Sequence, residues 1–463
     1  MNATERTLPR RARFRLGLMV AALACGCATE PPFPATITIS PPGVTIRSGA
    51  GARLVATVID QDGRAIEGAR VDWSSSDSSV ATVSGDGMSV VVKPAGSGSA
   101  SVSASVGPVE AIAPVTVDAD HRLVLMEFYR ALDGDGWKRH ANWGTDAPLG
   151  TWHGVKTDAE GKVTELTFGD NGLTGMIPAS IAMLETLEIL FLINNSGLTG
   201  SIPPQLGNLP NLWYLTLYYN SLSGPIPPEL GNLTKLEILQ LRNNELTGSI
   251  PPELGKLENL WFLSMDGNRL TGPIPPELGN LENLRDLSMN GNQLTGPIPP
   301  ELGNLRSLVG LWTGGNQLTG PIPPELGKLE NLWFLSMDGN QLTGPIPPEL
   351  GKLRNLGHLW ASGNQLTGPI PPELGKLQRL SYLLLSHNEL SGPVPPELGG
   401  LRFLSSLRIN HNPLSGRLPR EMIGVPLLGF SWHETDLCSP PDQEFQEWLE
   451  SIEDNQGNRK CSS

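Results

Sequence analysis

The sequence predicts two architectures in one chain of 463 residues: a small all-β sandwich, followed by a curved solenoid with parallel strands on its concave face and short helical turns on its convex face. Residues 36–117 alternate apolar and polar side chains between clusters of Gly, Pro, Asp and Ser, as half-buried strands do. From Leu173 to Leu414 a Leu-(Thr/Ser)-Gly triplet recurs every 24 residues after one step of 25. A fixed period of this length predicts a repeat solenoid.

Composition limits the function of the chain. It has 33 Lys and Arg against 47 Asp and Glu, and the formal charge of −14 argues against a nucleic-acid partner. The 53 glycines and 42 prolines make up about a fifth of the residues, so turns are frequent and repetition is expected. The four cysteines lie near the two ends and are too few for a disulfide scaffold.

Residues 1–24 predict an export signal. Arginines precede an apolar run, residues 16–24, which is too short to span a bilayer but long enough for the core of a signal peptide. A twin-arginine signal at Arg10-Arg11 fits less well, because the residues after this pair differ from that pattern. The sequence therefore predicts that the protein leaves the cytoplasm.

The residues Ala22-Leu23-Ala24-Cys25 resemble the cleavage site of bacterial lipoproteins, in which the cysteine is acylated. The resemblance implies a lipid anchor at Cys25, and Gly26 after it implies the outer membrane or the cell surface. Such sites usually have Leu where Ala22 stands, so two alternatives stay open: acylation of Cys27, and an ordinary secreted protein cut nearby. Residues 25–35, which are rich in proline, predict a stiff linker away from the membrane.

The predicted sandwich, residues 36–117, contains the stretches Val71-Asp72-Trp73-Ser74 and Val80-Ala81-Thr82-Val83. These resemble the group-2 bacterial immunoglobulin-like (Ig-like) domain. The resemblance implies a spacer or adhesive module without catalytic chemistry, with Trp73 in the core between the sheets. The stretch Asp60-Gln61-Asp62-Gly63 lacks the later ligands of a calcium loop and predicts a turn instead.

The repeat region, residues 163–430 with about 11 repeats, follows the pattern Leu-x-x-Leu-x-Leu-x-x-Asn, as at Leu212, Leu215, Leu217 and Asn220. This pattern resembles a leucine-rich-repeat solenoid. The sequence Leu-Thr-Gly-Pro-Ile-Pro-Pro-Glu-Leu-Gly at residues 270–279 is similar to the plant-type subclass found in receptor-kinase ectodomains and polygalacturonase inhibitors. The export signal and the Ig-like domain, in contrast, are bacterial in character.

Each part of the repeat has a predicted structural role. The leucines of a short strand point inward, so the residues between and beside them face solvent on the concave side. The repeated Asn is expected to satisfy backbone groups that a buried turn leaves unpaired. Pro276-Glu277-Leu278-Gly279 predicts a short helical turn that begins with proline.

Capping segments are expected at both ends, because terminal repeats must shield the core from water. Residues 118–162 are similar to the amino-terminal cap of plant-type repeats, but Gly150 and Thr157 stand where those caps have a cysteine pair. The stretch Asp133-Gly134-Asp135-Gly136-Trp137 predicts a cap turn and not a calcium loop, because Trp137 occupies a ligand position. In residues 431–463 an amphipathic helix lies between Cys438 and Cys461, which predicts a disulfide in an exported protein.

The concave face is predicted to be unusually aromatic. Trp and Tyr are common energetic anchors at interfaces, and their rings also stack on sugars. The positions expected to face solvent, and therefore to bind a ligand, are Trp213, Tyr214, Tyr218, Trp261, Phe262, Asp266, Trp312, Trp333, Phe334, Asp338, Trp360 and Tyr382. Residues 251–268 and 323–340 are identical, so part of this pattern is also consistent with duplication and a purely structural role.

No catalytic constellation is predicted. The sequence contains no Gly-x-Ser-x-Gly, no phosphate-binding Gly-rich loop and no His-Glu-x-x-His. His387 and His411 fall in one column of adjacent strands, but no third ligand is evident, so we expect solvated histidines and neither a metal nor another cofactor. The spacing of Asp266, Asp286 and Asp338 does not suit a pair of glycosidase carboxylates.

The sequence therefore predicts a non-enzymatic recognition protein of the cell surface. Its membrane attachment is the lipid anchor, and its partner is a protein or a polysaccharide bound on the aromatic concave face, with no nucleic acid involved. An alternative also stays open: a structural or adhesive stalk without a defined ligand, in which near-identical repeats set only the length.

Overall fold

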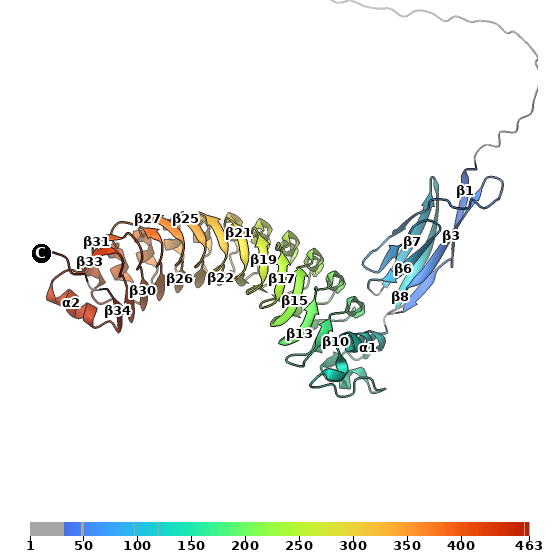
Figure 1. The fold of residues 1–463 in the computed structure, drawn as a ribbon, viewed down its shortest axis with the longest axis horizontal. Coiled ribbons are helices and arrows are strands. Elements are labelled where there is room, and N and C mark those ends of the chain that lie inside the picture. Colours follow the sequence, from blue (N-terminus) through green and yellow to red (C-terminus); the bar gives the residue numbers. More distant parts are fainter. Residues whose placement is uncertain (1–31, 48–50, 97, 119, 458, 463) are drawn as a thin grey trace, which may run out of the picture.

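A computed structural model describes residues 32–47, 51–96, 98–118, 120–457 and 459–462. The predicted export signal and the cysteines proposed for acylation, Cys25 and Cys27, lie outside these residues. None of the helices in the described part of the chain is long and apolar enough to cross a membrane. Figure 1 shows a β-sandwich at one end and an arched solenoid that forms the rest of the described chain.

The sandwich consists of two four-stranded sheets in the described residues. Alternate side chains of β3 and β7 are buried between the sheets, as the period-2 pattern predicted. One sheet has the order β1 (Pro34–Ser40), β3 (Ala52–Asp60), β6 (Ser89–Pro94), β5 (Ala81–Ser84), and the other β2 (Val44–Arg47), β8 (Val109–Asp118), β7 (Gly98–Val106), β4 (Asp72–Ser75).

Two sequence expectations can be checked inside the sandwich. Trp73 is half-buried and not fully enclosed: it lies on β4, the edge strand of its sheet, and its indole N–H donates to the carbonyl of Gly87, 2.9 Å away. Asp60 forms the predicted turn: its carboxylate accepts from the backbone N–H groups of Asp62 and Arg64 at 2.9 and 2.8 Å. The side chain therefore replaces backbone partners within the turn.

The amino-terminal cap consists of α1 (His121–Ala131), two 3-10 turns, η1 (Gly134–Gly136) and η2 (Leu149–Thr151), and the first strands of the solenoid. Its core is a group of buried aromatic side chains in mutual contact, at centroid distances of 4.8 to 6.4 Å: Phe128, Trp137, Trp143, Trp152 and Phe168. Trp137 is buried here, which agrees with the prediction of a cap turn at this position.

His121 connects the cap to the first repeat. Its Nδ1 accepts from the backbone N–H of Val163 at 2.9 Å, so Nε2 carries the proton that faces Glu185, 3.2 Å away. Lys162 donates to the same carboxylate at 2.6 Å. Burial raises the pKa of Glu185, but the hydrogen bonds from His121 and Lys162 outweigh it and lower the pKa to about 2.

The solenoid contains two long sheets. In the described chain the concave sheet has fourteen strands, parallel except for the antiparallel pair β9 and β10. Figure 1 shows β22, β26 and β30 along the inner edge of the arch. The strands are β9 (Val155–Thr157), β10 (Val163–Thr167), β12 (Ile189–Phe191), β14 (Tyr214–Thr216), β16 (Ile238–Gln240), β18 (Phe262–Ser264), β20 (Asp286–Ser288), β22 (Gly310–Trp312), β24 (Phe334–Ser336), β26 (His358–Trp360), β28 (Tyr382–Leu384), β30 (Ser406–Arg408), β32 (Gly429–Ser431) and β34 (Asp454–Gln456).

The second sheet, of ten parallel strands, contains the Leu-Thr-Gly segments. The typical strand, such as β21 or β23, buries one leucine and exposes the residues on both sides of it. The strands are β11 (Thr174–Met176), β13 (Asn195–Gly200), β15 (Asn220–Pro225), β17 (Glu245–Gly248), β19 (Arg269–Gly272), β21 (Gln293–Gly296), β23 (Gln317–Gly320), β25 (Gln341–Pro345), β27 (Gln365–Gly368) and β29 (Glu389–Leu390).

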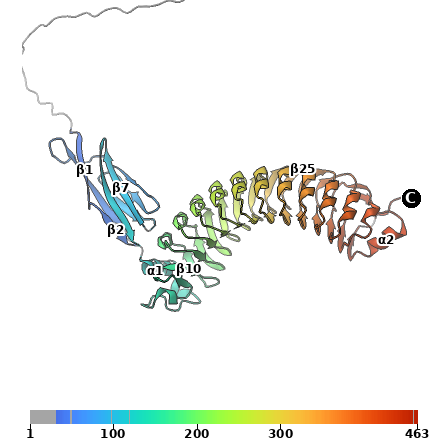
Figure 2. The same ribbon diagram turned by 180° about the vertical axis from the view of Figure 1, so that it is seen from behind.

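Short 3-10 helices on the convex side complete each repeat, and Figure 2 shows these turns stacked along the arch. They confirm the helical turn predicted for Pro-Glu-Leu-Gly, with proline at its first position. The turns are η3 (Ala179–Met183), η4 (Pro204–Asn208), η5 (Pro228–Asn232), η6 (Pro252–Lys256), η7 (Pro276–Asn280), η8 (Pro300–Asn304), η9 (Pro324–Lys328), η10 (Pro348–Lys352), η11 (Pro372–Lys376), η12 (Pro396–Gly400) and η13 (Arg420–Met422).

The repeated asparagines form a continuous ladder inside the solenoid. Asn268 is typical: its Nδ2 donates to the carbonyls of Leu241 and Met265, each at 3.0 Å, and its Oδ1 accepts from the N–H of Leu246 at 3.0 Å. The side chain is buried, so no water replaces these bonds. The asparagine therefore satisfies backbone groups of two successive repeats, as the sequence predicted.

The glycine of each Pro-Glu-Leu-Gly turn allows successive turns to approach closely. A Cβ on Gly255 would lie 2.3 Å from the carbonyl oxygen of Glu277 in the next repeat. The same close approach recurs at Gly279, where the oxygen of Glu301 would lie at 2.5 Å. Any larger residue at these positions would force successive repeats apart.

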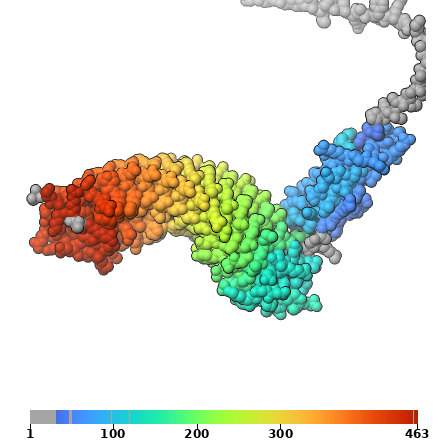
Figure 3. Space-filling model, in the orientation of Figure 1, coloured from blue at the N-terminus to red at the C-terminus, as the bar shows by residue number. Residues whose placement is uncertain are grey.

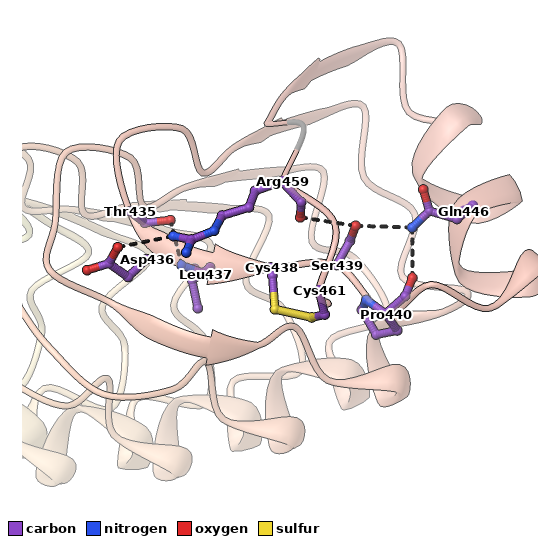
Figure 4. Close-up of a disulfide and its surroundings, with 9 residues drawn as sticks. All are labelled: Thr435, Asp436, Leu437, Cys438, Ser439, Pro440, Gln446, Arg459 and Cys461. Atoms are coloured by element: carbon purple, nitrogen blue, oxygen red, sulfur yellow. Dashed lines mark hydrogen bonds and ion pairs between the residues drawn. A yellow bond between two sulfur atoms is a disulfide. The ribbon is translucent and has the colours of Figure 1, made fainter. Parts of the chain in front are cut away.

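The carboxyl-terminal cap closes the far end of the solenoid. Its helix, α2 (Gln443–Glu450), buries one apolar face, and β34 adds the last strand to the concave sheet. A short pair, β31 (Ser415–Arg417) and β33 (Asp436–Cys438), lies beside it. The predicted disulfide between Cys438 and Cys461 is present, and Figure 4 shows it beside the hydrogen bonds of Ser439.

The sandwich contacts the solenoid at its amino-terminal end. The side chain of Asn208, in η4, donates to the carbonyl of Ser79 at 3.1 Å. A hollow of about 420 Å³ next to this contact is lined by Lys93 of the sandwich and by Glu127 and Met183 of the cap and first repeat. Figure 3 shows the concave side of the arch running away from this junction.

Candidate binding site on the concave face

The concave face is built from three-residue strands in exact parallel register. In β24 and β26, Phe334 pairs with His358, Leu335 with Leu359 and Ser336 with Trp360. The leucines are buried, and the residues on either side of them point out of the core. Successive strands lie about 4.8 Å apart, so each outward column places like positions within contact distance.

Four rings form a continuous stack across β22, β24, β26 and β28. The centroids of Trp312 and Phe334 lie 5.4 Å apart, those of Phe334 and His358 4.8 Å, and those of His358 and Tyr382 4.8 Å, each pair nearly parallel. We call this set, Trp312, Phe334, His358 and Tyr382, the aromatic stack. Offset stacking at these distances stabilises aromatic pairs beyond the burial of their area.

Trp312 joins the aromatic stack because Gly310 leaves room for it. Trp312 ends β22 two residues after Gly310, which occupies the column of the other three rings, and its indole leans back over Gly310. A Cβ on Gly310 would lie 1.9 Å from the indole. The absence of a side chain at Gly310 therefore allows the aromatic stack to begin at Trp312.

Two further tryptophans flank the stack. Trp360 meets Phe334 edge to face, with centroids 4.6 Å apart. Trp333 precedes its strand by one residue, lies over Gly357 and meets His358 edge to face at 5.8 Å. Trp333 and Tyr382 are each 40% exposed, so the group presents ring edges and two open flanks to solvent.

His358 was not among the predicted site residues. It lies in the column between Phe334 and Tyr382, and reading the sequence by column would have found it. Burial lowers the pKa of His358, which favours the neutral ring inside the stack. Its Nδ1 and the Nε1 of Trp360 are both enclosed and have no hydrogen-bond partner among the described residues.

The other predicted aromatic residues form separate groups. Trp213 contacts Tyr214, which stacks on Phe191 of the preceding strand at 6.4 Å. Tyr218 lies under the guanidinium of Arg242 at 4.5 Å, a cation–π contact that sequence analysis did not identify.

Trp261 and Phe262 contact each other at 5.8 Å and lie apart from the aromatic stack. Their strand, β18, is flanked by β16 and β20, which place Ile238 and Asp286 beside Phe262. The predicted residues are therefore all outside the buried core, but they do not make one uniform surface.

The two aspartates predicted for ligand binding differ in their surroundings. Asp266 accepts from Ser264 at 2.8 Å, from the hydroxyl of Ser288 and from the N–H of Asn290 at 2.9 Å. Among the described residues the carboxylate of Asp338 accepts from the hydroxyl of Ser336 at 2.5 Å and from no other group. Asp266 is thus held by its own framework, whereas Asp338 has free acceptor capacity.

A hollow of about 400 Å³ lies on the carboxyl-terminal half of the concave face, next to the aromatic stack. Asp338 and Trp360 line one end of it and Ser431 and Gln456 the other, with Ser386, Arg408 and Asn410 between them. Arg408 is exposed and was also absent from the predicted site residues. We call this space the carboxyl-terminal hollow.

His387, which lines this hollow, stacks on His411 with ring centroids 4.0 Å apart, and His411 pairs with Glu434 at 2.8 Å. In the described residues no group of three or more His, Cys, Asp or Glu side chains is arranged to hold a metal ion.

Family models match both parts of the chain. The bacterial Ig-like domain (group 2) matches residues 35–117. A leucine-rich repeat region matches residues 166–314, and single leucine-rich repeats match residues 331–353, 355–377 and 379–401. No protein of curated function matches the chain.

Solved structures similar to the chain include receptor ectodomains. The Arabidopsis receptor kinase HAESA, in complex with the peptide hormone IDA and the co-receptor SERK1, is 33% identical with a TM-score of 0.57, over 69% of this chain and 58% of that one. The PEPR1–AtPEP1 structure is 30% identical with a TM-score of 0.55, over 73% and 55%. The chain thus spans a little over half the length of these receptor structures.

A third similar structure is that of a plant ice-binding protein. It is 30% identical to this chain with a TM-score of 0.53, and the match covers 69% of this chain and 95% of that protein.

Proposed function

Because this chain belongs to the leucine-rich-repeat proteins, with a group-2 bacterial Ig-like domain before the repeats, we propose that it is a non-enzymatic recognition module of the bacterial surface. Its partner binds on the concave face around the aromatic stack. The family models that match describe repeats and an Ig-like domain, and none of them describes an enzyme.

The observation that carries the proposal is the aromatic stack. A buried core needs no stack of half-exposed rings on its solvent side, since the leucines beneath already fill the interior. Aromatic clusters of this kind at the centre of a concave surface are typical binding hot spots. HAESA, to which the chain is similar, was solved in complex with a peptide hormone, which supports a binding role.

The two identical segments provide a matched test. Phe334 lies in the aromatic stack, and Phe262 has the same position in the identical segment but contacts Trp261 outside the stack. Phe334→Ala is expected to weaken partner binding at least tenfold, and Phe262→Ala to leave it unchanged. The measurement is binding of the purified protein to panels of envelope proteins and glycans. Equal effects of the two variants would contradict the proposal.

The location of the module is extracytoplasmic, as the Ig-like domain and the disulfide indicate. We propose further that a lipid on Cys25 anchors it in the outer membrane. Labelling of cells with radioactive palmitate tests this: Cys25→Ala is expected to abolish the label and Cys27→Ala to retain it. The opposite result would move the anchor to Cys27, and no label on the unchanged protein would exclude the anchor.

A second candidate function, binding to ice, is favoured by a different surface. The second sheet exposes one column of threonines, Thr247, Thr271, Thr295, Thr319 and Thr343, and beside it a column of glutamines, Gln293, Gln317, Gln341 and Gln365. The columns form a regular array of neutral hydroxyl and amide groups, about 4.8 Å apart across strands. A regular, uncharged surface suits an ordered partner, and the chain is similar to a plant ice-binding protein.

Lysines placed in the threonine column test this candidate. Thr295→Lys combined with Thr319→Lys is expected to abolish any inhibition of ice recrystallisation, because long charged side chains disrupt the array. Phe334→Ala serves as the control and is expected to leave it intact. If the unchanged protein does not inhibit recrystallisation, this candidate is excluded and the concave-face proposal is unaffected.

A further inference from the structure

The carboxyl-terminal hollow differs from the aromatic stack beside it, because most of the residues that line it are polar or charged, although apolar atoms contribute the larger share of its surface. Trp360 and Leu384 are its apolar contributions, and the remaining lining consists of polar or charged side chains with hydroxyl, amide, imidazole, carboxylate or guanidinium groups. The lining therefore fits a ligand that combines groups for hydrogen bonding and ion pairing with one flat face to lie on Trp360.

One end of the hollow contains a carboxylate with free acceptor capacity. Asp266 and Asp338 lie in identical segments, but the next repeat differs: Ser288 follows Asp266, and Trp360 stands at the matching position after Asp338. Ser288 donates a hydrogen bond to Asp266, and Trp360 donates none to Asp338 among the bonds of the described residues. Asp338 is therefore oriented into the hollow with a lone pair available for a donor on a ligand.

The middle of the hollow contains a cation. Arg408 ends β30, where its neighbours in register, Leu384 and Ser431, carry no charge. Among the described residues no carboxylate lies within ion-pair distance of its guanidinium. A guanidinium in this position offers planar, bidentate donors that match a carboxylate.

The carboxylate and the cation are separated by the length of a short oligosaccharide. Asp338 belongs to the repeat of β24 and Arg408 to that of β30, three strand steps away, which corresponds to about 14 Å. Between them, Ser386 and Asn410 line the floor, bonded to each other at 2.6 Å. A ligand that fills the hollow must present donors to Asp338, a flat face to Trp360 and an anionic group to Arg408.

We propose that the carboxyl-terminal hollow is a subsite for an acidic polysaccharide, in which a sugar ring lies against Trp360, its hydroxyls donate to Asp338, and the carboxylate of a uronic-acid residue pairs with Arg408. This rests on the proposed function of the concave face and names its ligand class. The net charge of −14 opposes an anionic ligand at long range, but salt screens charges beyond about 8 Å, and Arg408 acts at contact distance.

A peptide is the competing ligand, and the hollow suits it less. Peptide recognition relies on a few apolar pockets for side chains or on an exposed strand edge. The concave strands are paired on both sides throughout β22 to β32, so they offer no edge to which a peptide strand could add.

The experiment compares matched pairs of tetrasaccharides by calorimetry with the purified full-length protein: mannuronate with mannose, glucuronate with glucose, and galacturonate with galactose. At least one uronate is expected to bind at least tenfold more tightly than its neutral counterpart. Arg408→Gln is expected to remove this preference, and Asp338→Asn to weaken both members of the pair. Arg402→Gln and Asp266→Asn make the same chemical changes outside the hollow and are expected to leave binding unaltered.

Three results would overturn the inference: no binding of any uronate, a preference that survives Arg408→Gln, or an equal loss with Asp266→Asn. The outcome also separates this inference from the proposed function. A protein or peptide partner whose binding is lost in Phe334→Ala, but is retained in Asp338→Asn and Arg408→Gln, would keep the concave face as a binding site and exclude the acidic-sugar subsite. If Phe334→Ala affects no partner of any class, the proposed function itself fails.

Discussion

Asp266 and Asp338 have the same position in two identical segments, yet only Asp266 accepts a hydrogen bond from the hydroxyl of the next repeat. The difference comes from Ser288 and Trp360, the residues that the following strands place beside them. In a solenoid each repeat contacts its neighbours alone, so the function of a side chain depends on the repeat after it. The same contrast applies to Phe262 and Phe334.

The asparagine ladder is predicted to be essential for stability. Asn268→Leu removes three buried hydrogen bonds and leaves their backbone partners unsatisfied, so we expect a loss of about 3 kcal/mol in the free energy of unfolding. Urea unfolding measures the loss, and hydrogen exchange is expected to localise it to the adjacent repeats. The exposed Gln293→Leu is the control, and an equal loss there would contradict the role of the ladder.

Adjacent glycines in the last 3-10 turns are predicted to differ sharply. A Cβ on Gly399 would lie 2.0 Å from the carbonyl oxygen of Glu421, whereas one on Gly400 would find its nearest contact at 3.8 Å. Gly399→Ala should therefore destabilise the protein by about 1–3 kcal/mol through overpacking. Gly400→Ala should be neutral or slightly stabilising, because alanine restricts the unfolded chain. Thermal unfolding of the two variants measures this difference, and a similar melting temperature for both would contradict the close packing at Gly399.

The disulfide is predicted to stabilise the carboxyl-terminal cap. Cys438 and Cys461 enclose a separation of 23 residues, for which the chain-entropy model gives about 3.4 kcal/mol. The double variant Cys438→Ser and Cys461→Ser should lose up to this amount, and α2 should exchange its amide protons faster. A reducing agent should destabilise the unchanged protein and have no effect on the double variant. If reduction affects both equally, the disulfide is not the cause.

Acid is predicted to loosen the amino-terminal cap. The pKa of Glu185 in the folded protein, about 2, lies below its ordinary value of 4.5, so its contribution is fully present above pH 4.5 and is lost as the pH falls toward 2. The stability difference between the unchanged protein and Glu185→Gln should therefore be at its full value above about pH 5 and be lost as the pH falls toward 2. The exposed Glu188→Gln should show no such dependence. A difference that stays constant with pH would contradict the ion-pair role.

The position of Trp312 is predicted to depend on Gly310. In Gly310→Ala the new Cβ would overlap the indole, so Trp312 must leave the aromatic stack. We expect a weaker near-UV circular dichroism signal and weaker partner binding, with little change in melting temperature. Gly429→Ala is the control from the same column, since its Cβ would find only ordinary contacts, the nearest at 3.7 Å. An unchanged signal in Gly310→Ala would show that Trp312 does not depend on this gap.

Much of the fold follows from periodicity. The regular recurrence of Leu-Thr-Gly predicted the solenoid, and the alternation around Leu54 and Val58 predicted the sandwich, because burial on one face imposes a fixed period on the sequence. Capping residues and the Cys438–Cys461 disulfide were also predictable. Trp73 was predicted to lie in the core but is only half-buried, since pattern analysis does not show where a sheet ends.

The candidate site was only partly predictable. The aromatic residues were found, but His358 and Arg408 were missed, because neither belongs to a recognisable motif. Their importance comes from the side chains that adjacent strands place next to them, and this depends on register across repeats. Aligning the repeats and comparing equivalent positions would have identified His358. It would not have identified the free acceptor capacity of Asp338, which depends on the absence of a hydrogen bond.

The sequence by itself determined the local rules of this protein: which residues are buried, where each repeat turns, and that asparagine and glycine recur where backbone groups or space require them. The tertiary structure decided which of the chemically equivalent residues became a site. Residues 251–268 and 323–340 are identical in sequence, but the second segment packs against His358 and Trp360 and the first against Asp286 and Ser288. Identical side chains acquire different partners because contacts between repeats, and not within them, complete the concave face.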